Sequence, residues 1–486
     1  MTCLIVLGGV LAALPLVWTA PAHATGEGLV DDYRSVYGTP GVAAAVIDGS
    51  SVETIVRGRD GDGNAVTPRT RFRIASMSKS MTAAAVMLLV DRDRVSLDDP
   101  VVKVLPEFRL ADPRFTAITV RQILSHTSGL SNSTNNEYVF PPPRGAREIV
   151  ARLADKTLAA APGTRSEYHN TNYSIAARIV EVVSGKSFDA FLHTELFTPL
   201  GMSDTSSTLG CSDGAEGLPS GYEVVLGLAV AAPEMPGMCV GNGGVISTLD
   251  DMVRWLRFNQ GTLGVDLLSA RSLTESHTPQ PKAGDYALGW QSRPAPVSGI
   301  GHGGTLATWT GDMVFSPKTG MAALVLTNSG GDPSLLSANL LGAPATPMSN
   351  PLNPVNAILL GLTAVTAALL LTAIARSRHW ATRRRPARRP MLTLRLTPLA
   401  LVTVLGALLP TFIWGSFNLQ YWIVTAWLLP LLALFSLTCA LLGSAALTRR
   451  LWHYHRPTHP TPTQNPGRSR GPAPHSTELG MNDTRE

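Results

Sequence analysis

The residues that point most directly to chemistry are a serine and a lysine three positions apart, Ser76 and Lys79. On the first turn of a helix, this spacing places both side chains on one face. A serine hydroxyl becomes a useful nucleophile when a base accepts its proton, and a desolvated lysine amine can be that base. A helix N-terminus also stabilises a developing oxyanion. The pair predicts a nucleophilic serine, although this spacing is also common on ordinary helix surfaces.

Two further segments carry side chains that suit a serine site. Tyr168 and Asn170 follow a Pro-Gly-Thr turn, where a phenol can relay a proton and an amide can hold Lys79 and the substrate. The alternative is a turn and the N-cap of the next helix. His302 lies in Gly-His-Gly-Gly-Thr, where glycine allows close backbone approach and the imidazole can donate to a carboxylate. The alternative for His302 is a side chain that fills a strand edge.

The cysteines and the charge distribution indicate neither a metal site nor a cofactor. Only Cys211 and Cys239 lie outside the terminal apolar runs, and they lack nearby His or Cys partners for zinc. A disulfide between them and two unpaired thiols both remain open. The net charge of +5 comes from bases that are concentrated after residue 340, beside apolar runs, so it does not indicate nucleic-acid binding.

Taken in order, these motifs resemble the serine beta-lactamase and penicillin-recognising family, in its branch of class C beta-lactamases, D-Ala-D-Ala carboxypeptidases and esterases. Residues 72–79 match the branch's Phe-x-Ile-x-Ser-x-x-Lys, and residues 124–130 match its His-Thr-Ser-Gly-Leu signature. Residues 168–170 match its Tyr-x-Asn. Residues 302–304 stand where the family has Lys-Thr-Gly or His-x-Gly. The resemblance covers about residues 28–330.

The resemblance implies a catalytic role for three of these residues. It implies that Ser76 is the acylated nucleophile and that Lys79 is its proton partner. It also implies that Tyr168 is the general base in acylation and deacylation. Asn170 would be an orienting residue of the site. His126 matches a signature position that is not catalytic in the family, and we expect it to be a structural histidine in its loop.

The family's Lys-Thr-Gly or His-x-Gly sequence is its third motif, and the resemblance implies that His302 takes the role of this motif here. It also implies that Gly303, Gly304 and Thr305 contribute to substrate binding. The backbone N–H groups of Ser76 and Thr305 would form the oxyanion hole. Residues 318–320 spell Lys-Thr-Gly but lie in a turn between the last two strand-like runs, so we reject them as the third motif. Because an imidazole is not a fixed cation, His302 favours esterase or peptidase activity over lactamase activity.

These residues need a scaffold that brings distant segments together. Residues 41–48 form an apolar run that ends in a turn and predicts a hairpin with the next stretch. The expected fold is α/β (α+β) and beta-lactamase-like: an antiparallel sheet flanked by helices, plus a helical subdomain around residues 95–240, with Ser76 at their junction. Helical patterns follow Ser76 and Thr119 and cover residues 147–161, 173–184 and 249–258, while residues 312–315 and 321–326 are strand-like.

Both ends of the chain differ in composition from this region. Residues 1–24 are expected to be a signal peptide, because an apolar run precedes a small-x-small cleavage pattern, although no Lys or Arg precedes the run. Residues 25–340 would form the serine hydrolase domain. Residues 341–353 contain three prolines and predict a linker.

The C-terminal third predicts three transmembrane helices. Residues 354–375 are uncharged and long enough for one span, and residues 396–448 are long enough for two, with a hairpin near residues 415–418. Residues 376–395 are rich in Arg and lack acids, so we expect a cytoplasmic loop. Residues 449–486 predict a disordered cytoplasmic tail. This count makes the chain a multi-pass protein of the cell membrane with an extracytoplasmic catalytic domain.

The leading hypothesis is acyl transfer to water through an acyl-Ser76 intermediate. The expected partners are a small-molecule or peptide acyl donor and the lipid bilayer; the donor is an ester, a D-amino-acid peptide or a lactam, in that order. The alternative is a non-catalytic sensor of cell-wall peptides that signals through the spans, but a sensor need not keep Ser76, Lys79 and Tyr168. A transporter is disfavoured because the spans hold no ionisable residue.

Overall fold

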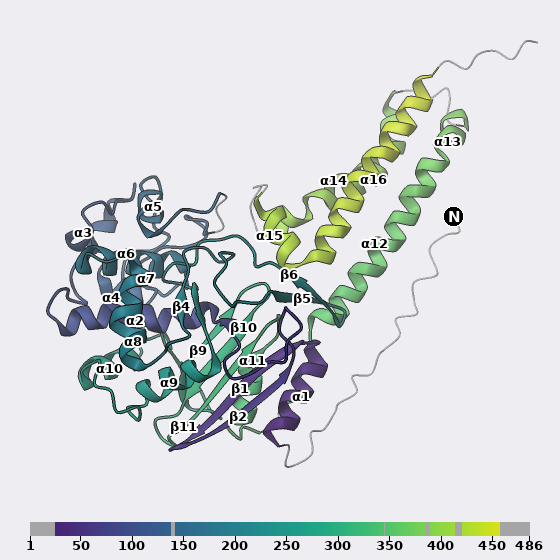
Figure 1. Cartoon of the computed structure of the whole chain (residues 1–486). Coiled ribbons are helices and arrows are strands. Elements are labelled where there is room, and N and C mark those ends of the chain that lie inside the picture. The colour runs from purple at the N-terminus through teal and green to yellow at the C-terminus, as the bar shows by residue number, and fades with distance from the viewer. Residues whose placement is uncertain (1–24, 138–140, 345, 384–388, 414–419, 457–486) are drawn as a thin grey trace, which may run out of the picture.

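An antiparallel sheet lies at the centre of the N-terminal region in this computed structural model, which describes residues 25–137, 141–344, 346–383, 389–413 and 420–456 (Figure 1). The strand order β2-β1-β11-β10-β9-β8 pairs the first two strands with the last four, and every pairing is antiparallel. The strands are β1 (Gly41–Asp48), β2 (Ser51–Gly58), β8 (Gln291–Arg293), β9 (Gly299–Thr305), β10 (Thr310–Phe315) and β11 (Met321–Thr327).

Both faces of the sheet are covered, which explains why β1 is apolar at consecutive positions. Ala43 and Ala45 belong to the main core, whereas Val42 and Ala44 belong to a smaller cluster on the other face. A strand that is buried on both faces needs apolar side chains at both alternating sets of positions. The smaller cluster also contains residues of helices α1 (Gly26–Tyr37) and α11 (Pro333–Leu340). The hairpin predicted for β1 and β2 is confirmed.

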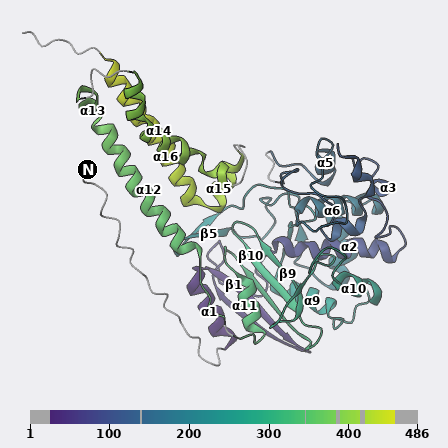
Figure 2. The ribbon, with the colours of Figure 1, turned by 180° about the vertical axis from the view of Figure 1, so that it is seen from behind.

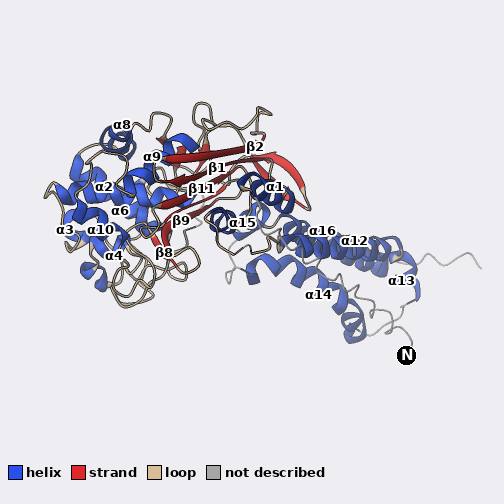
Figure 3. Cartoon of the chain, turned by 90° about the horizontal axis from the view of Figure 1, so that it is seen from below, coloured by secondary structure: helices blue, strands red, loops and turns tan. Residues whose placement is uncertain are grey.

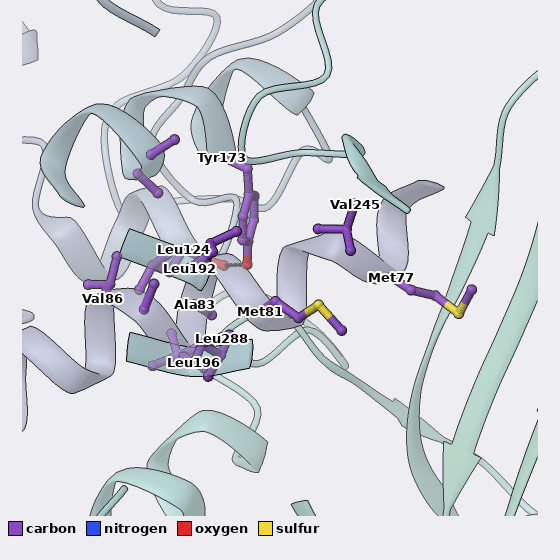
Figure 4. Close-up of a cluster of buried hydrophobic side chains, with 14 of the residues drawn as sticks. Met77, Met81, Ala83, Val86, Leu124, Tyr173, Leu192, Leu196, Val245 and Leu288 are labelled. Atoms are coloured by element: carbon purple, nitrogen blue, oxygen red, sulfur yellow. Dashed lines mark hydrogen bonds between the residues drawn. The ribbon is translucent and has the colours of Figure 1, made fainter. Parts of the chain in front are cut away.

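Helix α2 (Ser78–Asp91) passes through the main core. Its residues from Ser78 to Leu89 are all buried, as expected for the apolar run that begins at Ala83, and the burial extends to the polar first turn. Figure 4 shows side chains of this helix packed against Tyr173 and Leu124, whose backbone oxygen accepts a hydrogen bond from the Tyr173 hydroxyl at 2.7 Å. The helix is therefore held in place by the core, and its N-terminal end lies beside the sheet.

The middle of the chain forms the expected helical subdomain, and Figure 3 shows its helices gathered at the opposite end of the sheet from the C-terminal helices. The predicted antiparallel sheet flanked by helices is confirmed. One prediction is wrong: residues 147–161 are not one helix, because the chain turns after residue 152 and the N–H of Ala159 donates to the oxygen of Gly129 at 2.9 Å. The helices are α3 (Val101–Val104), α4 (Val120–Leu124), α5 (Ala146–Ala151), α6 (Asn170–Ser184), α7 (Phe188–Leu192), α8 (Thr198–Leu200), α9 (Leu249–Asn259) and α10 (Ala270–His277).

Two small sheets complete this region. Strand β7 (Val245–Ser247) pairs with β3 (Phe72–Arg73) and with β4 (Ser206–Ser207). Strands β5 (Gly221–Val225) and β6 (Leu228–Ala232) form a hairpin that the helical prediction missed. Cys211 and Cys239 form a disulfide with a Cα–Cα distance of 4.9 Å, which settles the alternative left open by the sequence.

Three C-terminal helices are long and apolar enough to cross a membrane: Leu352–Ala375, Pro390–Ile413 and Pro430–His455. They form a bundle in which a side chain on Gly443 of α16 (Pro430–His455) would collide with Thr403 of α14 (Arg389–Ile413). Small residues allow such close contact between helices in a membrane. The first of the three is α12 (Leu352–Ala375).

The connecting segments are more helical than the sequence predicted. Part of the expected loop 376–395 forms α13 (Ser377–Arg383) and the start of α14, and α16 runs into the expected tail. Prolines and arginines suggested irregular structure there, but helical hydrogen bonds continue past the apolar segments. A further short helix, α15 (Gln420–Leu428), precedes α16. The expected signal at residues 1–24, the hairpin near residues 415–418 and the tail after residue 456 lie outside the described residues.

Candidate active site

Ser76 lies where the sheet meets the helical subdomain. It occupies a 3-10 turn, Ala75–Met77, between strand β3 and helix α2. Ala75 has a φ of 49°, in the left-handed region that costs a non-glycine residue about 1 to 2 kcal/mol. The surrounding structure therefore holds this turn in a conformation that it would not adopt alone. Ser76 itself remains partly exposed, and it lines two neighbouring cavities.

The amine of Lys79 is hydrogen bonded to the Ser76 hydroxyl. Its Nζ lies 2.9 Å from Ser76 Oγ and donates to the backbone oxygen of Asn242 at 2.7 Å. The Lys79 side chain is fully buried, at 0% exposure. A completely buried lysine is expected only where its charge is stabilised or its proton is lost.

Burial lowers the pKa of Lys79 from 10.5 to about 7, and the nearby Glu137 carboxylate opposes this shift only in part. Desolvation destabilises the charged ammonium, so the neutral amine becomes available near physiological pH. The sequence suggested that Lys79 is desolvated, and in the structure its side chain is fully buried.

Tyr168 lies close to both the Lys79 amine and Ser76. Lys79 Nζ is 4.9 Å from the centre of the Tyr168 ring. The Tyr168 side chain is 42% exposed, yet burial around its hydroxyl raises the pKa, and a hydrogen bond with Ser76 partly offsets this effect. The phenol is therefore protonated in the resting site. The structure thus brings Ser76, Lys79 and Tyr168 together, and their catalytic roles stay predictions.

A cluster of aromatic rings packs against the ring of Tyr168 and holds it in place. The ring of His126 lies 4.4 Å from that of Tyr168 and 4.7 Å from that of Tyr286, measured between centroids. His126 Nδ1 accepts from the His169 backbone N–H at 3.2 Å and from the Asn172 amide at 3.1 Å. Burial, followed by the nearby Lys79 charge, lowers the pKa of His126, so its imidazole is neutral. These contacts agree with the structural role expected for this histidine.

His302 projects from β9 and is also neutral. Its Nδ1–H donates to the backbone oxygen of Gly303 at 2.6 Å, which leaves Nε2 to accept from the Tyr286 hydroxyl at 3.1 Å. Burial, with a smaller effect of the Lys79 charge, lowers the pKa of His302 to about 3. The third-motif position therefore carries no positive charge at neutral pH, and its imidazole is fixed as one tautomer.

The remaining predicted residues line the cavities around Ser76. Thr305 and Asn170 contribute to both cavities, whereas Gly303 and Gly304 contribute to one. Asn170 is the first residue of α6 rather than a loop residue, and its N–H donates to Glu137 at 2.8 Å. Its buried side-chain oxygen has no hydrogen-bond partner among the described residues, so the expected contact with Lys79 is not formed in this state.

The two cavities differ in character. One has a volume of about 350 Å³ and lies on the side of Asn242 and the disulfide. The other has a volume of about 590 Å³ and lies on the side of Tyr168, His302 and Arg293. The Arg293 guanidinium is 2.7 Å from the buried Asp312 carboxylate, which offsets much of its charge. Within the described part of the chain, no group of three or more His, Cys, Asp or Glu residues could hold a metal ion.

Three residues of this site were missed in the sequence. They are Asn242, whose backbone oxygen binds Lys79, Tyr286, which holds His302, and Glu137, which faces the amine. The Gly-Asn-Gly-Gly run around Asn242 was a usable signal of close backbone approach. Tyr286 and Glu137 lie in segments whose sequence carries no comparable signal.

The rejected Lys-Thr-Gly at residues 318–320 lies in the turn between β10 and β11. It does not line either cavity. His302 therefore remains the candidate for the third-motif position.

Comparison with known proteins adds family information to this geometry. A family model described as "Beta-lactamase" matches residues 27–345. Penicillin-binding protein 4 of Amycolatopsis lactamdurans is 32% identical over 337 residues, which are 63% of this chain and 86% of that protein. D-alanyl-D-alanine-carboxypeptidase/endopeptidase AmpH of Escherichia coli is 29% identical over 360 residues, which are 67% of this chain and 88% of that protein. The octameric penicillin-binding protein homologue from Pyrococcus abyssi shares the fold, with a TM-score of 0.56, 24% identity, and coverage of 66% of this chain and 77% of that one.

We predict that Gly304→Ala slows reaction of Ser76 with a fluorophosphonate at least tenfold. A Cβ at this position would collide with the backbone oxygen of Ile74, in the turn that carries Ser76. Gly214→Ala is the control, because this glycine lines neither cavity and its Cβ would meet nothing within 4 Å. Equal rates for the two variants would contradict the close fit of β9 to this turn.

The lowered pKa of Lys79 predicts a pH dependence. Because only the neutral amine accepts a proton, the rate of Ser76 phosphonylation should rise with pH through about 7 and then level off. Lys79→Arg keeps a fixed cation, so we expect a rate about 10²- to 10⁴-fold lower and no such rise. Rates measured between pH 5.5 and 9 test this; a wild-type profile that is flat across the range would show that the amine is not the titrating group.

Proposed function

Because the chain belongs to the beta-lactamase family of serine hydrolases, we propose that it hydrolyses acyl donors through an acyl-enzyme intermediate on Ser76. The observation that carries this proposal is the hydrogen bond of 2.9 Å between the fully buried Lys79 amine and the Ser76 hydroxyl. An amine with a pKa of about 7 is well matched to proton transfer at neutral pH.

In the first step, Lys79 takes the hydroxyl proton as Ser76 Oγ bonds to the carbonyl carbon of the donor. The backbone N–H groups of Ser76 and Thr305 stabilise the oxyanion of the tetrahedral intermediate. The bond to the leaving group then breaks, and the proton returns to the leaving group through the Tyr168 hydroxyl. Since Tyr168 is a neutral phenol in the resting site, it acts as a relay, and Lys79 is the base.

In the second step, water releases the acyl group. Water attacks the ester carbon, gives its proton to the Lys79–Tyr168 pair, and restores the Ser76 hydroxyl. Asn170, with an unpartnered side-chain oxygen beside the cavity, is placed to hydrogen bond a donor amide N–H. This sequence consumes one water and yields a carboxylic acid and the free leaving group.

The charges around Ser76 favour an ester or a D-amino-acid peptide as the donor. His302 is neutral and cannot clamp a carboxylate as a fixed cation would. Arg293 lines the same cavity but is already paired with Asp312. Such a site suits a neutral donor, such as an ester or a D-amino-acid peptide without a free C-terminal carboxylate, better than an anionic lactam. The printed name of the Escherichia coli relative supports D-amino-acid peptides as a class to test.

The arrangement of the helices supports an extracytoplasmic catalytic domain. In Figure 1, the globular domain lies at one end of the helix bundle and α13 lies at the other. The basic residues Arg376, Arg378, Arg449 and Arg450 all belong to that far end. By the positive-inside rule, the far end is cytoplasmic and Ser76 is outside.

We predict turnover of p-nitrophenyl esters or of an acyl-D-Ala-D-Ala peptide by the full chain in detergent or nanodiscs. Ser76→Ala should reduce turnover at least 10³-fold. Ser133→Ala, which changes a serine outside both cavities, is the control and should keep wild-type turnover. Covalent trapping of donors without turnover would instead favour the non-catalytic sensor.

The orientation predicts accessibility from outside the cell. In intact cells that express the full chain, a membrane-impermeant fluorophosphonate should label Ser76 as fully as it does after lysis. The Ser76→Ala chain provides the background. Labelling that requires lysis would place the catalytic domain in the cytoplasm and reverse the proposed topology.

A further inference from the structure

A third cavity lies between the Ser76 site and the C-terminal helices. It has a volume of about 510 Å³, and it shares Leu306, Ala307 and Leu428 with the smaller of the two cavities that Ser76 lines. Leu428 is the last residue of α15, so the wall of the catalytic cavity includes a residue from the C-terminal third. We call these two neighbouring cavities together the trough, because their shared wall lies between Ser76 and the helix bundle.

The far part of the trough is apolar enough to hold a hydrocarbon chain. Its apolar lining includes Val224 and Val225 of β5, Leu335 of α11, Trp427 of α15 and the adjoining Leu429. The uncharged polar side chains that also line it are Tyr37, Thr346, Ser349, Asn350 and Asn356. Binding sites for apolar ligands combine apolar walls of this kind with a small number of polar groups.

The charged groups of this lining exclude an anionic head group. The acids are Glu223 and Asp332, and no Lys or Arg lines this cavity among the described residues. Burial raises the pKa of Glu223 to about 7, with a smaller effect of Glu234, so part of its population is neutral. A phosphate or carboxylate would therefore find no positive side chain here and would be repelled by these acids when they are ionised, whereas an uncharged chain would not.

The trough ends at the level where the long helices begin. Leu352 and Pro430, the first residues of α12 and α16, belong to its lining. The β5–β6 hairpin lies beside the same helix ends in the two opposite views of Figures 1 and 2. On this hairpin, Leu228 is 73% exposed and Val230 is 64% exposed. Exposed apolar residues beside the ends of membrane-spanning helices suit the bilayer interface better than water.

The loop between the two cavities is held in place. The buried Glu234 carboxylate accepts from the N–H of Ala307 at 3.1 Å, and from the N–H and hydroxyl of Thr308 at 2.9 and 2.7 Å. The wall that the two cavities share at Ala307 is therefore a fixed part of the fold rather than a loose loop.

We propose that the acyl donor of Ser76 carries a long uncharged hydrocarbon chain, which enters from the bilayer and lies in this trough. This proposal rests on the function proposed above, and it adds the class of substrate and the route by which it arrives. The chain occupies the part lined by Val225 and Leu335, while the reacting carbonyl lies at Ser76. A donor anchored in the membrane also gives a reason for the hydrolase to be fixed to its surface.

The test compares two fluorophosphonates that differ only in an ethyl or a dodecyl chain, on the full chain in nanodiscs. Ser76 Oγ displaces fluoride from phosphorus, so intact-protein mass spectrometry gives the rate of each reaction. We expect the dodecyl probe to react at least tenfold faster, since each buried methylene contributes about fourfold. Val225→Asp and Ala307→Trp should each lower the ratio of the two rates at least fivefold.

The controls separate the trough from simple partitioning of the probe into lipid. Val182→Asp changes an exposed valine of α6 that lines neither cavity, and it should keep the wild-type ratio. If Ser76 reacts with both probes but the ratio of the two rates in the wild type is near one, the proposal is overturned. The same holds if both trough variants leave this ratio unchanged. Failure of both probes to modify Ser76 in the wild type would instead overturn the proposed function.

Discussion

Desolvation of one amine is the constraint on which the site depends. Lys79 would be a protonated cation at neutral pH in water, and only its removal from water makes it a base for Ser76. The fold achieves this by burying α2 from Ser78 to Leu89, which includes the polar first turn that carries the lysine. The backbone oxygen of Asn242 and the rings of Tyr168 and Tyr173 then satisfy the amine without an ion pair.

The same constraint explains the neutral imidazoles beside it. A residual positive charge on Lys79 and deep burial both disfavour a second cation, and the pKa values of His126 and His302 are accordingly lowered. The two histidines beside Lys79 are thus neutral hydrogen-bonding groups rather than additional cations. Such a site recognises a donor by shape and hydrogen bonds, which agrees with an apolar trough as its extension.

The sequence predicted the features that depend on local pattern. The β1–β2 hairpin, the last two strands, the helices after Ser76 and Thr119 and the three long apolar helices all follow from periodicity and turn residues. The expectation of a serine beside a lysine followed from spacing and family resemblance together, and the structure places these two side chains in contact.

What the sequence missed depends on tertiary contacts. The segment after residue 152 leaves the helix because its backbone bonds to the Gly129 loop, and β6 is a strand although its side chains are exposed. Asn242 acts through its backbone oxygen, and only the glycines on either side of it mark this segment in the sequence. The link between the Ser76 cavity and Leu428 joins residues that are distant in sequence, so only the folded chain shows it.

The most direct test of this account is to locate the covalent adduct. The full chain is incubated briefly with an activated ester at pH 8, quenched in acid, digested and mapped by tandem mass spectrometry. The account predicts one acyl group on Ser76, and its loss over time as water releases it. An adduct that forms on another residue, or an acyl group on Ser76 in equal yield when Lys79 is replaced by Arg, would contradict the claim that the desolvated amine activates this hydroxyl.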